Sequence, residues 1–322
     1  MGPLANARAR WPGALSPGIR AMVLGAFFFS LMSLFVKLAG ARIPTPQIVL
    51  VRGVLSLTLA YAMLRRARVD NWGHRKGLLV LRGLVGFTAL SCFYFALVRL
   101  PLADATVIQY TSPVWTAWFS WLVLGERAGR RETALSLASL LGVLLIARPS
   151  FLFGSGAALQ PLAVAVALLG AVFSATAYVS VRKLGETEHP LVIVFYFTAV
   201  TVPAALPGLA LGAVWPTPLE WLWLLGVGVT AVLGQLYLTR GLQLEPAGRA
   251  TTAGYVQIVF AALWGALFFA ELPDLWSLAG TLLILACVLA IGRQRARAPA
   301  AAEQAQRPYE RKRRATRRTL LR

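Results

Sequence analysis

The sequence predicts an all-α integral membrane protein of ten transmembrane helices, arranged as two inverted repeats of five. Composition is the first reason: of 322 residues, 58% are hydrophobic and only 14% are charged, whereas a soluble domain carries roughly 25% charged residues. The second is that the apolar runs have about the length that crosses a bilayer. The third is a duplication, because the pattern of residues 101–126 returns without a gap at 246–271.

The duplicated stretch organises the whole chain. In both copies a proline opens an apolar run, a glutamate closes it, and a tyrosine stands at the same place between them. Because another apolar run follows each copy in the same register, the chain is expected to be a duplicated membrane unit. Identical residues at the offset of 145 are Pro101/Pro246, Ala105/Ala250, Thr106/Thr251, Tyr110/Tyr255, Ala117/Ala262, Leu122/Leu267 and Glu126/Glu271.

The first apolar run, 19–39, follows a basic N-terminal segment, as the core of a signal peptide would. It is about as long as a bilayer span, however, and no A-x-A-like cleavage site follows it, so we interpret it as a retained helix. The other runs follow in order, with short loops between them. The ten predicted spans are 19–39, 46–64, 77–98, 102–124, 131–147, 160–181, 190–211, 218–240, 247–270 and 275–292.

Lys and Arg are distributed unevenly over the connecting loops. With alternate loops assigned to opposite sides, 26 of the 32 basic residues lie on one side together with both termini, three lie on the other, and three lie within spans. Basic loops remain in the cytoplasm, so both termini are expected to be cytoplasmic in a multi-pass protein of the cell (inner) membrane. The net charge of +20 then reflects topology, and no nucleic-acid partner is indicated.

The two repeats are expected to run in opposite orientations, because each contains an odd number of spans. In transporters, inverted repeats place a substrate site near the midplane between the two halves, and access alternates as one half rocks on the other. Tyr110 and Tyr255 would then meet the same depth from opposite sides. The predicted domains are an N-terminal cytoplasmic tail over 1–18, a first repeat over 19–149, a second repeat over 155–292 and a basic tail over 293–322.

The C-terminal tail is rich in Arg and has almost no apolar residues, so we expect it to be disordered and cytoplasmic. Because it follows directly on a span, its positive charge suits binding to the anionic headgroups of membrane lipids. The alternative is a solvated tail that only fixes topology.

Three basic residues lie within predicted spans, where a charge costs at least about 2.5–3.5 kcal/mol at the helix centre. Lys37 and Arg82 lie near span ends, so their side chains are expected to reach the interface. Arg52 is roughly two turns from either end of its span, and its guanidinium needs either a structural partner or a substrate. If two of the three face a central cavity, that cavity prefers anions.

Acidic residues are absent from the middle of every predicted span, and His74 and His189 lie in loops. Proton or Na⁺ relays in membranes normally use a buried carboxylate or histidine, so tight cation coupling through the core is not expected. Glu126 and Glu271 close equivalent spans and are expected to fix helix ends or gates. No metal site, cofactor or catalytic residue is predicted.

Pro113 is expected to interrupt the fourth span, because it cannot donate to the carbonyl of Gln109. That carbonyl is a candidate ligand group, and a packed kink satisfied by a neighbouring helix is the alternative. The second repeat has Ile258 at this place, so the halves are not expected to be chemically equivalent. The predicted substrate-binding residues are Ser33, Lys37, Arg52, Arg82, Tyr94, Gln109, Tyr110, Ser112, Pro113, Tyr178, Gln235, Tyr255 and Gln257.

These features resemble the drug/metabolite transporter superfamily, with two EamA-type repeats over residues 19–292. The resemblance depends on the duplicated five-span unit, on Ala105-Thr106 followed by Pro113, and on Leu124-Gly125-Glu126 at the end of the fourth span. Shorter motifs are similar to the G-type branch of the solute carrier 35 family. These motifs are Ser33-Leu34-Phe35-Val36-Lys37, Arg82-Gly83, Leu102-Ala103-Asp104-Ala105-Thr106-Val107-Ile108, Ser112-Pro113-Val114 and Phe151-Leu152-Phe153-Gly154.

The resemblance implies ten helices with both ends cytoplasmic and a central cavity lined by the first, third, fourth, sixth, eighth and ninth helices. It implies transport of small organic metabolites, and the branch has been linked to organic anions. The chain departs from the pattern where it lacks a proline opposite Pro113 and a glycine before Glu271. Both departures argue against symmetric chemistry in the two halves.

We therefore expect a secondary transporter, an exporter or exchanger of a small organic solute with an anion favoured. An integral-membrane enzyme acting on lipid or acyl groups is the alternative, but it needs a nucleophile, base or metal cluster at a membrane surface, and only His74 and His189 are available. A third possibility is a membrane-bound interaction protein that uses the basic tail. Whether the protein is a monomer or a homodimer is left open.

Overall fold

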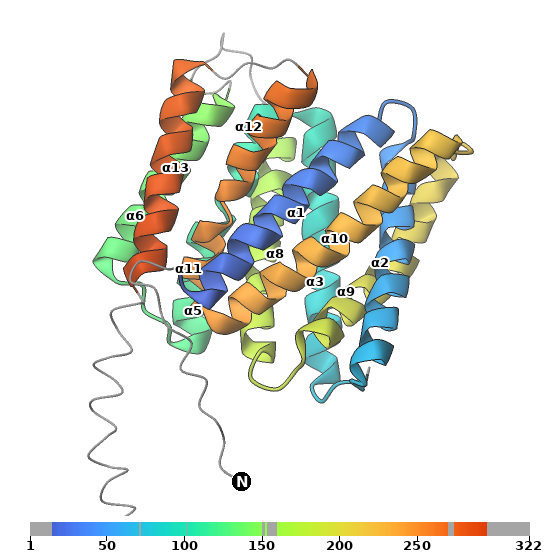
Figure 1. Cartoon of the computed structure of the whole chain (residues 1–322), viewed down its shortest axis with the longest axis horizontal. Helices are drawn as coiled ribbons and strands as arrows, with labels where there is room; N and C mark the ends of the chain where they lie inside the picture. The colour runs from blue at the N-terminus through green and yellow to red at the C-terminus, as the bar shows by residue number, and fades with distance from the viewer. Residues whose placement is uncertain are drawn as a thin grey trace, which may run out of the picture.

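The computed structural model describes residues 15–70, 72–100, 102–149, 152, 160–269 and 274–294, and regular structure within these ranges is entirely helical (Figure 1). The helices are α1 (Pro17–Ala39), α2 (Thr45–Ala67), α3 (Lys76–Arg99), α4 (Leu102–Gln109), α5 (Ser112–Leu124), α6 (Arg130–Ala147), α8 (Pro161–Leu184), α9 (Pro190–Ala205), α10 (Pro218–Leu244), α11 (Ala247–Ala253), α12 (Val256–Phe269) and α13 (Leu275–Gln294). A 3₁₀ turn, η1 (Leu206–Leu211), extends α9.

Eight helical segments in the described part of the chain are long and apolar enough to cross a membrane. The all-helical, multi-pass membrane class is therefore confirmed, whereas the count of ten is not. Predicted span 102–124 is divided into the short helices α4 and α5. Predicted span 131–147 becomes α6, whose 18 residues include Arg130, Arg131 and Glu132.

Several helices begin at a proline, namely α1, α8, α9 and α10. The first turn of a helix has N–H groups without intrahelical partners, so a residue that lacks an N–H costs nothing there. At α10 the start is reinforced by Thr217, whose hydroxyl accepts from the N–H of Glu220, while the Glu220 carboxylate accepts from the N–H of Thr217. These caps define where each apolar run becomes a helix.

The helices pack in pairs that follow the duplication. α1 packs against α10, and α3 packs against α8. α6 packs against α13, and α2 packs against α9. If the repeats are exchanged, so that α1 replaces α8 and α3 replaces α10, the first two pairings become each other, and the other two are unchanged because each joins equivalent helices of the two repeats. Figure 1 shows α1 and α10 side by side across the front, with α6 and α13 together at one edge.

Small residues allow the closest of these approaches. A Cβ placed on Gly142 of α6 would lie 2.9 Å from the carbonyl oxygen of Gly280 on α13, and one on Gly280 would lie 2.5 Å from the carbonyl oxygen of Gly142. Neither distance is possible for a real side chain, so both positions require glycine. Packing of this kind is typical of helices in lipid, where no hydrophobic effect drives them together.

The core and the lipid-facing surface are both apolar. The largest fully buried side chain is Tyr255, and Ile19, Leu242 and Ile284 lie in the same cluster. Large apolar side chains such as Leu282 are exposed along the outer faces of the bundle. A soluble protein rarely exposes so much contiguous apolar surface, so lipid is the solvent for these faces.

Candidate functional site

Both repeats contain a broken helix, and the two breaks fall at equivalent positions. α4 ends at Gln109 and α5 begins at Ser112, while α11 ends at Ala253 and α12 begins at Val256. Each break contains one of the paired tyrosines, Tyr110 or Tyr255. The two predicted midplane tyrosines therefore stand at the interruptions of their spans.

The two breaks meet across the interface between the repeats. The Tyr255 hydroxyl donates to the backbone carbonyl of Tyr110 at 2.9 Å, and the two rings have centroids 5.6 Å apart. Pro113 lies in the first turn of α5. In the second repeat the helix is interrupted at Gly254, where there is no proline. Pro113 was expected to make the two halves differ, but the backbone is interrupted in both of them.

A small cavity lies between α2, α3, α9 and α10. Its polar lining consists of Arg52 and Ser56 on α2, Thr198 and Thr201 on α9, and Gln235 on α10. The volume is about 10 Å³, which is close to the minimum that holds one water molecule. The structure thus brings together two of the predicted substrate-binding residues, Arg52 and Gln235.

The polar groups around this cavity are unequally satisfied. The hydroxyls of Thr198 and Thr201 donate to carbonyls of their own helix, at 3.1 Å to Val194 and 2.7 Å to Phe197. Arg52 is half-buried, and no ion pair to it is present within the described residues. Its positive charge is therefore the main electrostatic feature of the cavity.

Arg82 lies at the edge of the same region. Its guanidinium carbon is 4.2 Å from the centre of the Phe197 ring, and Phe197 lines the cavity. The side chain was expected to reach the membrane interface, but it is only 3% exposed, so that prediction is wrong. Protein packing on α3, α8 and α9 encloses the guanidinium before it can reach the helix end.

A row of polar residues connects Arg82 to the helix breaks. Tyr178 on α8 is close enough to Arg82 and to Tyr110 for electrostatic interaction. Nearby, the Gln109 amide donates to the Ser174 hydroxyl at 2.9 Å. The Gln109 side-chain oxygen is buried and has no hydrogen-bond partner in the described part of the chain. This oxygen is therefore available to a ligand that carries a donor.

The other predicted residues do not line the cavity. Ser33 and Lys37 are exposed on α1, and Tyr94 packs against the apolar cluster that contains Val49 and Leu50. Gln257 is half-buried on α12, and Ser112 is buried with its carbonyl accepting from a neighbouring hydroxyl. These residues do not line the cavity that contains Arg52.

Sequence reasoning missed the contribution of α9. Phe197, Thr198 and Thr201 all face the cavity, although the resemblance assigned the lining to other helices and not to the second and seventh spans. The spacing of Thr198 and Thr201, three residues apart, places both on one face of a helix. That pattern is the only sequence signal that pointed to this face.

One end of the bundle is held by Glu126. Its carboxylate accepts from the Ser120 hydroxyl at 2.5 Å, from Arg182 Nε at 2.7 Å and from the Ala247 backbone N–H at 2.9 Å. Arg182 also donates to the Gln243 carbonyl. The expectation that Glu126 fixes helix ends is confirmed, while Glu271 lies outside the described residues.

A second charged cluster at this end is deeply buried. Glu245 is 1% exposed, and its carboxylate accepts from the Ser16 hydroxyl at 2.6 Å. Arg249 is 3.5 Å from Glu245 and 3.5 Å from Glu132, and it also donates to the Ile291 carbonyl. These contacts join the start of α1 to the ends of α10 and α13.

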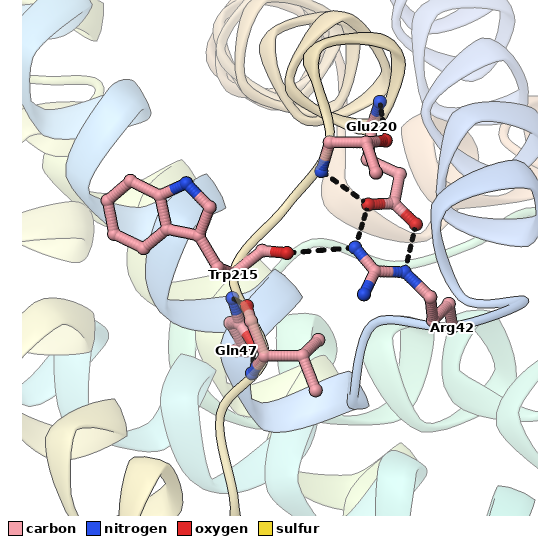
Figure 2. A network of polar contacts seen from close by, with 6 residues as sticks. Arg42, Gln47, Trp215 and Glu220 are labelled. Atoms are coloured by element: carbon pink, nitrogen blue, oxygen red, sulfur yellow. Dashed lines mark hydrogen bonds and ion pairs between the residues drawn. The ribbon is translucent and has the colours of Figure 1, made fainter.

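The opposite end of the bundle is held by more exposed contacts (Figure 2). Arg42, between α1 and α2, pairs with both carboxylate oxygens of Glu220 and donates to the Trp215 carbonyl at 2.8 Å. The side chain of Gln47 exchanges two hydrogen bonds with the backbone of Val214, at 2.7 and 2.9 Å. The hydrogen bond to Glu220 raises the pKa of Arg42 above its ordinary value.

Both histidines serve as connections at helix ends. The His189 side chain accepts from the N–H of Leu191 and caps α9, and partial burial near Arg240 lowers the pKa of His189. His74 donates its backbone N–H to Glu188 at 2.7 Å. Among the described residues, no group of three or more His, Cys, Asp and Glu side chains is arranged to hold a metal ion.

Comparisons with known proteins place this architecture among transporters. Residues 16–148 and 161–293 each match the model of the EamA-like transporter family. The pseudopaline exporter CntI of Pseudomonas aeruginosa (strain UCBPP-PA14) is 39% identical over 280 residues, which cover 87% of this chain and 97% of that protein. Human solute carrier family 35 member G1 is 31% identical, with coverage of 88% and 80%.

A solved crystal structure supports the fold independently. It superposes on this chain with a TM-score of 0.77 at 17% sequence identity, covering 87% of this chain and 99% of the other. At that identity the likeness concerns the arrangement of helices alone.

Proposed function

The chain belongs to the EamA-like transporter family, and on this premise we propose that it is a secondary transporter of a small organic solute, with an organic anion favoured. The observation that carries the proposal is the contact between the two helix breaks, where the Tyr255 hydroxyl bonds the Tyr110 carbonyl. Discontinuous helices that meet between two repeats form the substrate sites of many secondary transporters. General transporter activity also agrees with the relatives.

The proposed topology is ten spans in two inverted repeats, with both termini in the cytoplasm of an inner-membrane protein. α4 with α5, and α11 with α12, each form one interrupted span, and α6 forms the fifth. Five spans in each repeat require opposite orientations. The exchange symmetry of the helix pairs and the concentration of basic loops on one side support this arrangement.

Alternating access is supported by the unequal ends of the bundle. Glu126 and Glu245 hold the proposed cytoplasmic end with contacts that are largely buried. The cavity beside Arg52 has room for about one water molecule, so this conformation is closed around it. Transport requires a second conformation in which the contacts at one end separate and the cavity enlarges.

The preference for an anion is supported by charge. Arg52 lines the cavity, and Arg82 packs on Phe197, which also lines it. Within the described residues no acidic side chain pairs with either arginine. A cation enclosed by protein and lipid is costly unless it is paired. A substrate carboxylate would supply the missing charge. Among the predicted ligands, we propose Arg52, Arg82 and Gln235 as primary contacts.

The direction of transport is proposed to be outward, or to be exchange. An exporter among the relatives supports this direction. Exchange of one anion for another provides a driving force that needs no proton or Na⁺ relay.

Reconstitution into proteoliposomes tests the proposal. Vesicles are preloaded with a radiolabelled panel of mono-, di- and tricarboxylates and amino acids, and efflux is measured with and without unlabelled solute outside. We expect efflux of at least one anion above that of protein-free vesicles, and acceleration by external solute identifies exchange. Efflux equal to that of protein-free vesicles across the panel would refute the proposed function.

The basic tail is proposed to bind anionic lipids. Most of it, residues 295–322, lies outside the described residues. Sedimentation with phosphatidylglycerol vesicles of a peptide covering 295–322, compared with phosphatidylcholine vesicles, tests the idea, and equal binding to both would exclude an electrostatic role.

A further inference from the structure

The guanidinium of Arg82 carries N–H donors that no described residue accepts from. The residue is 3% exposed, and neither Nε nor Nη1 of its guanidinium has a hydrogen-bond partner within the described residues. It lies six residues into α3, about 9 Å along the helix from Lys76 at 1.5 Å per residue. A buried cation with unused donors is costly, so this arrangement implies a partner that is not among the described residues.

The guanidinium is held in place by packing instead of by an acid. It lies over the face of the Phe197 ring at 4.2 Å, a distance suited to a cation–π contact. Gly86 lies beside both groups: an added Cβ there would lie 2.5 Å from Arg82 Nη1 and 3.0 Å from the Phe197 ring. Glycine at this position therefore makes room for both groups.

Phe197 connects this cradle to the cavity of the proposed substrate site. Phe197 contacts Arg82 and also lines the cavity that contains Arg52 and Gln235. Tyr178 is close enough to Arg82 to interact with it electrostatically, and its phenol is a further donor for an anion. Phe197 thus contacts one arginine, Arg82, and lines the cavity that contains the other, Arg52.

We propose that Arg82 binds a carboxylate group of the transported solute, in a cradle formed by Phe197 and Gly86. This assignment rests on the proposed transport function and deepens it, because it names the chemical group recognised and the residue that recognises it. Guanidinium donors match carboxylate oxygens in geometry and charge. Arg52 would then contact a second polar group of the same solute. The arrangement therefore favours solutes with a carboxylate at one end and another polar group elsewhere.

Formate is a suitable probe because it is the smallest carboxylate and the closed cavity is small. The full-length protein is purified in detergent, and its unfolding temperature is measured with increasing sodium formate, with sodium chloride at equal ionic strength, and with formamide. Formamide has nearly the shape of formate without its charge. We expect the unfolding temperature to rise with formate alone, as it does whenever a ligand binds only the folded state.

Three variants test whether formate raises the unfolding temperature by binding at Arg82. Arg82→Gln should weaken the apparent formate affinity at least tenfold, while its unfolding temperature without ligand should not fall, because an unpaired buried charge has been removed. Gly86→Ala should weaken the affinity although Arg82 is still present. Arg99→Gln is the matched control: Arg99 is on the same helix and lies 3.7 Å from the Phe95 ring, but it is exposed, so formate binding should be unchanged.

Two results would overturn the assignment. One is an equal formate response in the wild-type protein and in Arg82→Gln, including no response in either. The other is a large loss of stability in ligand-free Arg82→Gln, since that would identify Arg82 as a structural element. Arg82→Lys is a second variant that keeps the charge but loses the planar donors, and it should also weaken formate binding.

Transport measured in parallel separates this assignment from the proposed function. Formate binding that depends on Arg82, without solute efflux from proteoliposomes, would refute transport and leave the carboxylate site. Efflux of an anion that is unaffected by Arg82→Gln would refute the site and leave transport.

Discussion

Replacement of Glu126 by Gln is the sharpest test of how the two repeats are joined. In the structure one carboxylate oxygen accepts from Arg182 Nε at 2.7 Å, and the other accepts from the Ala247 N–H at 2.9 Å and the Ser120 hydroxyl at 2.5 Å. Gln has the same shape but only one accepting oxygen. Whichever way its amide is turned, an NH₂ group meets either Arg182 or the Ala247 N–H, and both of these are donors.

The cost follows from the bonds that are lost. A hydrogen bond to a charged group contributes about 1.5–3 kcal/mol, and the remaining bonds weaken when the carboxylate charge is removed. The side chains are partly exposed, 28% for Arg182 and 19% for Glu126, so the full cost of breaking a buried ion pair does not apply. We expect a loss of about 2–4 kcal/mol in the free energy of unfolding.

Thermal unfolding of the purified protein measures this loss. At roughly 1.5 °C per kcal/mol for a chain of 322 residues, the unfolding temperature should fall by about 3–6 °C. Glu186→Gln is the control, because it removes the same charge from the exposed α8–α9 connection and should cost less than about 0.5 kcal/mol. Equal unfolding temperatures for Glu126→Gln, Glu186→Gln and the wild-type protein would refute this account of the interface.

Three further substitutions test other contacts. Tyr255→Phe removes the donor to the Tyr110 carbonyl and should destabilise the protein by about 0.6–2 kcal/mol in thermal unfolding; no change would show that the contact between the breaks contributes nothing. Gly142→Val would drive a methyl group into the Gly280 carbonyl, so loss of folded protein in size-exclusion chromatography is expected, and a normal yield would contradict the close packing. Arg52→Gln should weaken a transported carboxylate at least tenfold, about 1.4 kcal/mol, in a folded variant measured by efflux kinetics; unchanged affinity would make Arg52 structural.

The spans could largely be predicted from the sequence because their signals are local. Apolar length, proline starts and the repeated proline, tyrosine and glutamate positions are properties of contiguous residues. Predicted and observed boundaries agree within a few residues for most helices, as for 19–39 against Pro17–Ala39. The break at Pro113 was also predictable, since a proline removes a defined hydrogen bond. The equivalent break at Gly254 had no comparable signal, and the equivalence of the two repeats is what identifies it.

What the sequence by itself determined is a duplicated, all-helical membrane unit of the EamA type. Only the tertiary structure decided which polar side chains share a space. The burial of Arg82 and the cavity between Arg52 and Gln235 depend on how each helix is rotated about its axis and on which distant helix packs against it. In a helix that is apolar on every face, as most of these are, residue periodicity does not define that rotation, so small-residue contacts and neighbouring helices set it instead.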